Sequence, residues 1–251
     1  MAAAFLELAV FCVYRIERVA DPPTEVDPRR QRVGGSAFAA LSELTRSPYL
    51  LGVAGWVSLL SFGATIAYFA QANIVSATIH GAATQTRLFA GIDLAVSLLS
   101  LATQVFATAR FLKRFGTGIA AAALPAIYIV GFAALAIAPS LSVVVTLQVA
   151  QRWMNFAIAN PARQVFFTVV GREEKYKAKN LIDVVIYRGS DALYGWVYDS
   201  LQALGLKLGA IALCALPIAA GWFALSIALG RTQERLATKT PDEGASAWQS
   251  E

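Results

Sequence analysis

LIDVVIYRGSDALYGWVYDSL, residues 181–201, has the length and apolar content of a membrane-spanning helix, yet it contains charged side chains. Asp183, Arg188 and Asp191 lie inside it, and Arg152 lies inside the apolar segment before it. A charge at the centre of a bilayer costs about 2.5–3.5 kcal/mol on insertion scales, so such residues need an ion-pair partner or a water-filled cavity. We therefore predict that function lies between residues 152 and 198.

The composition of the whole chain is that of an integral membrane protein. Hydrophobic residues make up 57% of the sequence, charged residues only 15%, and the mean hydropathy is +0.56. Soluble domains carry about 25% charged residues. The apolar residues form runs of about 20, the length that a helix needs to cross a bilayer, and the alternating pattern of a membrane β-barrel is absent. The sequence predicts an all-α integral membrane fold.

The apolar runs predict a six-helix transmembrane bundle over residues 48–230. Residues 1–14 are too short to span, are interrupted by Glu7 and lack the basic start of a signal peptide. We interpret them as the remnant of a preceding transmembrane helix, which predicts that the chain is the C-terminal part of a longer protein. Residues 15–47 are predicted to be a linker and 231–251 a tail. The predicted spans are 48–75, 87–109, 117–138, 140–160, 181–204 and 208–229.

The lysines and arginines alternate between the two sides of this bundle. One side receives only Arg87 and Lys207, and the other receives the basic residues of the linker, of two loops and of the tail. By the positive-inside rule the linker and the C-terminus are cytoplasmic, in a membrane that we take to be the bacterial inner membrane. The net charge of +5 is therefore interpreted as a topology signal, and no nucleic-acid partner is expected.

Six spans with both ends inside, preceded by a basic linker, resemble the second half of a major facilitator transporter. Such transporters have two six-helix halves joined by a cytoplasmic loop. The resemblance implies transport by alternating access with a missing N-terminal half as partner. It also implies that the first, second, fourth and fifth spans line a central cavity, whereas the third and sixth face lipid.

Polar residues spaced by three or four lie on one face of each of these four spans. In the first span they are Ser58, Ser61, Thr65 and Tyr68; in the second Asp93, Ser97, Ser100 and Gln104; in the fourth Gln148, Arg152 and Asn155; in the fifth Asn180, Asp183, Tyr187, Asp191, Tyr194 and Tyr198, with Arg188 beside them. Other interpretations stay open. The serines and threonines can join helices to each other, Asp93 can form a salt bridge, and Arg188 and Asp191 can neutralise each other.

KYKAKNLIDVV, residues 175–185, resembles the lysine-rich segment before the eleventh helix of the ATP/ADP translocase family of intracellular bacteria and plastids, and more closely its relatives in free-living bacteria. The resemblance implies a twelve-helix antiporter that exchanges nucleotides, with basic residues on the phosphates. Lys177, Lys179 and Asp183 match the pattern. Residues 187–196, YRGSDALYGW, depart from it, because the translocases have smaller residues there.

The candidate substrate-binding residues are therefore Asp93, Gln104, Gln148, Arg152, Asn155, Lys177, Lys179, Asp183, Tyr187, Arg188, Asp191 and Tyr194. The sequence contains no phosphate-binding G-x-x-x-x-G-K-[ST] loop, no H-E-x-x-H motif and no clustered Cys/His set, so no enzyme activity, cofactor or metal is predicted. The expected partners are an anionic solute such as ATP or ADP, membrane lipid and the other half of the transporter. Two alternatives stay open: a facilitator for another organic anion or drug, and a non-transporting membrane fragment or scaffold.

Overall fold

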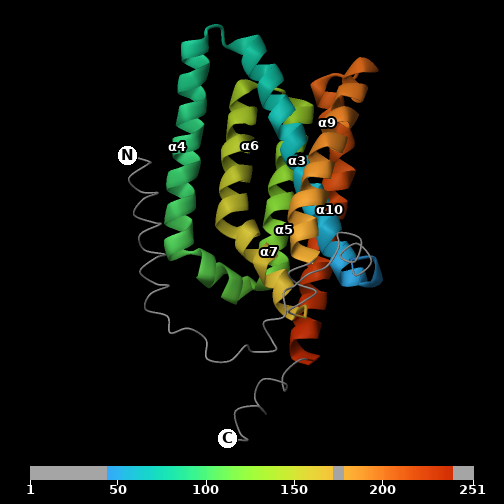
Figure 1. The fold of residues 1–251 in the computed structure, drawn as a ribbon. Coiled ribbons are helices and arrows are strands. Elements are labelled where there is room, and N and C mark those ends of the chain that lie inside the picture. The colour runs from blue at the N-terminus through green and yellow to red at the C-terminus, as the bar shows by residue number, and fades with distance from the viewer. Residues whose placement is uncertain (1–43, 172–177, 240–251) are drawn as a thin grey trace, which may run out of the picture. The chain divides into compact units, whose positions relative to one another are not determined.

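The computed structural model describes residues 44–171 and 178–239, and these are helical almost throughout (Figure 1). The predicted helix remnant 1–14, most of the linker and the end of the tail lie outside the described residues. In chain order the elements are α3 (Pro48–Thr78), α4 (Ala82–Phe106), α5 (Thr108–Ile137), α6 (Leu141–Met154), the π-helix η2 (Asn155–Ala159), α7 (Asn160–Phe166), the 3-10 turn η3 (Phe167–Val169), the π-helix η4 (Leu181–Ile186), α9 (Tyr187–Ala203) and α10 (Leu208–Lys239).

Two of the long helices begin where the sequence supplies a cap. Ser47 accepts a hydrogen bond from the backbone N–H of Leu50, and Pro48 occupies the first turn of α3, where its missing N–H is not needed. Ser140 caps α6 in the same way by accepting from Val143. These caps fix the starts of the first and fourth predicted spans within a residue or two.

Four helices in the described part of the chain, α3, α4, α5 and α10, are long and apolar enough to cross a membrane. They correspond to the first, second, third and sixth predicted spans. The fourth and fifth spans are present as helices that are interrupted by π turns, the fourth as α6, η2 and α7 and the fifth as η4 and α9. The predicted all-α membrane fold is confirmed, although two of its spans are not continuous α-helices.

Most basic residues of the described chain gather at one end of the bundle, and Arg87 and Lys207 lie near the other, as predicted. Successive helices run in opposite directions, so the start of α3, the α4–α5 junction, the segment after α7 and the end of α10 share one end (Figure 1). The loop predicted between the second and third spans is wrong, because α5 begins at Thr108 and already includes Arg110, Lys113 and Arg114. A kink at Gly116, with φ of 78°, separates this basic turn from the apolar part of α5.

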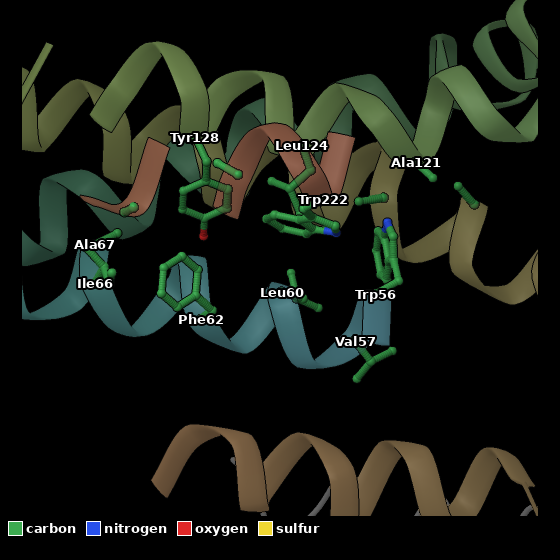
Figure 2. Packing of buried hydrophobic residues seen from close by; sticks show 14 of the residues in the cluster. Trp56, Val57, Leu60, Phe62, Ile66, Ala67, Ala121, Leu124, Tyr128 and Trp222 are labelled. Atoms are coloured by element: carbon green, nitrogen blue, oxygen red, sulfur yellow. The ribbon is translucent and has the colours of Figure 1, made fainter. Parts of the chain in front are cut away.

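The core is built around α5 and α10, which pack closely on each other and on α3. Trp222 of α10 lies between Trp56 of α3 and Tyr128 of α5, with ring centroids 5.8 Å and 5.5 Å away (Figure 2). The Trp56 indole N–H also donates to the Ser226 hydroxyl at 2.9 Å. One side of the third and of the sixth span is therefore buried against protein, and the expectation that their other side faces lipid stays a prediction.

Candidate functional site

A salt bridge joins the second and fourth predicted spans near the middle of the bundle. A guanidinium nitrogen of Arg152 on α6 lies 2.5 Å from a carboxylate oxygen of Asp93 on α4. The two side chains remain 38% and 61% exposed, so the pair lies on an open face rather than in the core. The structure thus places both candidates together and shows the salt bridge that the sequence left open for Asp93.

The polar stripe of the fifth span packs on the polar stripe of the first. Ser61 donates to the Asp191 carboxylate, Ser190 donates to Ser58 at 2.8 Å, and Ser58 also shares a hydrogen bond with the Tyr194 hydroxyl at 3.0 Å. The serines of α3 therefore join two helices, as one of the open interpretations stated. Whether Asp191 and Tyr194 also contact a solute stays a prediction.

Aromatic contacts extend this seam toward the other end of α9. Asn73 donates to the Tyr198 hydroxyl at 2.8 Å, and Phe69 stacks on the Tyr198 ring with centroids 4.4 Å apart. Phe62 meets Tyr194 edge to face at 5.1 Å. We call this contact the α3–α9 seam. Its members are Ser58, Ser61, Phe62, Phe69, Asn73, Ser190, Asp191, Tyr194 and Tyr198.

Arg188 stands beside the seam without a partner in it. Its side chain is exposed, and among the described residues no ion pair joins it to a carboxylate. The Asp191 carboxylate is instead held by Ser61 from the facing helix, so the alternative in which Asp191 neutralises Arg188 within one helix is not formed among the described residues. Tyr187 is half-buried one residue before Arg188, and the charges of both Arg188 and Asp191 act on its hydroxyl.

Gln148 lies in the interior rather than on an open face. It is 5% exposed and donates to the backbone carbonyl of Ala67 on α3 at 2.9 Å. Gln151 donates to Gln148 at 2.8 Å and accepts from the Tyr128 hydroxyl at 2.8 Å. This chain of buried hydrogen bonds connects α3, α5 and α6. Our sequence analysis missed Gln151, although its position three residues after Gln148 puts both amides on the same side of the helix.

The π-helix η2 is held by side chains of the neighbouring helices. Gln104 of α4 donates to the carbonyl of Phe156 at 3.0 Å, and Thr108 of α5 donates to the carbonyl of Ala157 at 2.8 Å. A π turn disturbs the regular helical ladder, so such carbonyls need donors from outside. The candidate Gln104 is therefore engaged with the backbone. The candidate Asn155 lies within η2, and its buried Oδ1 accepts no hydrogen bond from the described residues.

The remaining candidates lie at the basic end of the bundle. Arg163 of α7 forms an ion pair with Asp183 of η4 at 3.3 Å, and Lys179 donates to Gln164 at 2.7 Å. Both contacts join the end of the fourth span to the start of the fifth. Lys177 lies outside the described residues.

The described part of the chain does not enclose these candidates in one pocket. A mostly apolar groove of about 500 Å³ lies between α5 and α6, lined by Ala126, Ile127, Val130, Gly131, Ala134, Ser142, Val143, Thr146, Leu147 and Ala150. A smaller cavity of about 70 Å³ between α3, α9 and α10 includes Tyr194 and Tyr198. The described residues contain no cluster of His, Cys, Asp and Glu that could hold a metal ion. The candidates thus form separate groups on α4 and α6, on α3 and α9, and at the basic end.

Comparisons with known proteins find a likeness in structure and none to a family model or a curated protein. No family model and no curated protein matches the chain. One solved structure is similar to it, a bacterial homolog to the human lysosomal transporter Spinster in an inward-facing and unoccupied conformation, with 16% sequence identity and a TM-score of 0.48. The likeness covers 87% of this chain and 49% of that one, so this chain spans about half the length of the solved protein. A likeness of this degree assigns no family, and the translocase resemblance stays a prediction.

Proposed function

We propose that the chain is one half of a secondary transporter of the major facilitator type, which moves a small solute with an anionic group by alternating access. The observation that carries the proposal is the exposure of charged side chains near the middle of the helices. Asp93 and Arg152 are 61% and 38% exposed, and Arg188 is exposed as well. A charged side chain that faced lipid would cost about 2.5–3.5 kcal/mol. A water-filled cavity, closed by the other half of the transporter, is therefore the environment that suits these three side chains.

The anionic group of the solute is proposed because Arg188 is a cation without an ion pair among the described residues. A guanidinium presents a planar fork of donors that matches a carboxylate or phosphate, and the contact strengthens where water is scarce. A nucleotide is one candidate for this solute, and it comes from the translocase resemblance alone. Its support in the described residues is the position of Lys179 at the basic end, where a phosphate could approach the bundle.

Thiol labelling in native membranes tests whether the charged face meets water. In a chain with Cys12→Ser and Cys214→Ser, we would introduce Arg188→Cys and, separately, Phe223→Cys on the exposed side of α10. A charged, membrane-impermeant methanethiosulfonate should modify the cysteine at position 188 and leave the one at position 223 unmodified. The Phe223 variant is the control, because both positions are exposed in the described chain and only the proposed cavity distinguishes them.

Two outcomes would contradict the proposal. Equal protection of both positions would show that lipid covers the charged face, and the non-transporting scaffold would then be favoured. Equal modification would show that the reagent reaches the lipid side as well, and no cavity would need to be assumed.

A further inference from the structure

Two ion pairs join charged side chains of neighbouring helices inside the described spans. The arginines at 152 and 163 form ion pairs with the aspartates at 93 and 183, which come from neighbouring helices. Removing one partner of a pair in a low-dielectric site is costly, so these charges are engaged with each other. In α9, Arg188 and Asp191 have no ion pair among the described residues and stand on the same turn, one cation and one anion, whereas Asp199 lies further along the helix.

These two charges are held apart. Residues at i and i+3 on a helix have Cβ atoms about 5–6 Å apart, close enough for an ion pair to form. Ser61, which is fully buried in α3, donates to Asp191 and draws its carboxylate toward the α3–α9 seam. Arg188 remains exposed, and a Cβ at the adjacent Gly189 would meet no atom within 4 Å, so the helix surface is open at both positions.

We infer that the solute is a small zwitterion, whose anionic group binds Arg188 and whose cationic group binds Asp191. This inference rests on the proposed transport function and names the chemical class of its solute. A zwitterion satisfies both of these charges and leaves the site neutral. A nucleotide would bring several negative charges to a place that offers one unpaired cation and, beside it, a carboxylate that repels phosphate. Charge complementarity therefore favours the zwitterion over the nucleotide.

Four probes with controlled charge test the inference on the purified transporter, with both halves present, in lipid nanodiscs. 4-Aminobutyrate carries both charges, butyrate and butylamine each carry one of them on the same carbon chain, and ATP represents the nucleotide. Isothermal titration should give a dissociation constant for 4-aminobutyrate about 10- to 100-fold lower than for either single-charge probe, since each lost charged hydrogen bond has an effect of that size. ATP should bind more weakly than 4-aminobutyrate.

Two conservative variants assign the charges. Asp191→Asn keeps an oxygen that can accept from Ser61, so the seam stays intact while the preference for 4-aminobutyrate over butyrate is lost. Arg188→Gln should remove the preference over butylamine. Asp199→Asn is the matched control, because Asp199 is an exposed aspartate on the same helix and its loss should change none of the ratios.

Three results would overturn the inference. The first is that butyrate binds as tightly as 4-aminobutyrate. The second is that ATP binds most tightly of the four probes. The third is that none of the four probes binds. A failure here is distinguishable from a failure of the proposed function, because thiol labelling at position 188 does not depend on which probe binds. A labelled face with ATP as the tightest ligand would return the nucleotide as the solute of the same site.

Discussion

The contact between α5 and α10 makes a sharp prediction about Gly230. A Cβ built on Gly230 would lie 2.1 Å from the Cα and 2.5 Å from the backbone nitrogen of Gly118. Real side chains do not approach this closely, and backbone atoms cannot rotate away as a side chain can. Gly230→Ala must therefore push the two helices apart. We expect a loss of unfolding free energy of about 1–3 kcal/mol, the usual cost of overpacking a well-packed core, and a value toward the upper end because the obstacle is backbone.

Gly221→Ala, on the same helix, is the matched control, because a Cβ there would meet no atom within 4 Å. Removing a helical glycine without a clash should stabilise the protein by about 0.5–1 kcal/mol. The two variants therefore differ in sign. The assay is unfolding by sodium dodecyl sulfate followed by tryptophan fluorescence, since Trp56 and Trp222 are both buried in this core. If both alanines shifted the midpoint in the same direction by the same amount, the close packing of Gly118 on Gly230 would be refuted.

Two further predictions concern buried and paired polar groups. Arg152→Leu should lower the abundance of the protein in the membrane because it leaves Asp93 unpaired, and adding Asp93→Leu should restore that abundance. Immunoblots of membrane fractions measure the abundance. A double variant as scarce as the single one would contradict the pairing. Tyr128→Phe removes the donor to Gln151 and should destabilise the protein by about 1–3 kcal/mol in the same unfolding assay, whereas Tyr68→Phe, at a side chain that is 64% exposed, should leave the midpoint unchanged.

The positions of the spans were predictable because the thickness of a bilayer fixes how long an apolar run must be. The start of α5 was not. Arg110, Lys113 and Arg114 were interpreted as a loop, since positive charge marks the ends of spans. Charge on its own does not end a helix, and here the helix continues through the basic residues until the glycine at 116 turns the chain.

The candidate site was predictable in part. Periodicity put Asp93 and Arg152 on the polar faces of their helices, but it cannot say which faces of two helices meet. The salt bridge between them is therefore known only from the structure. The same limit explains Asp191 and Tyr194. Their regular spacing marks a polar face equally well whether that face lines a cavity or packs on the serines of α3, and the structure shows the second contact.

The π turns could not be predicted from the spacing of the polar residues. A wider turn shifts the angular position of every residue after it, so a pattern counted at 100° per residue loses its register across η2 and η4. Within a membrane the carbonyls that such a turn frees must find donors in the neighbouring helices. Gln104 fulfils that need at Phe156, which accounts for its polarity without a solute.

Asn155 differs from Gln104, because it lies inside the same π turn and its side-chain oxygen has no hydrogen-bond donor among the described residues. Its Oδ1 is buried and accepts no hydrogen bond from the described residues, a condition that costs about 1–3 kcal/mol for a polar group. It stands one turn along the fourth span from Arg152, whose charge is already neutralised by Asp93. Gln148 and Gln104 have partners among the described residues, and the Oδ1 of Asn155 does not. Among the amides of the predicted site, Asn155 is therefore the one for which contact with a donor group of a solute would recover free energy.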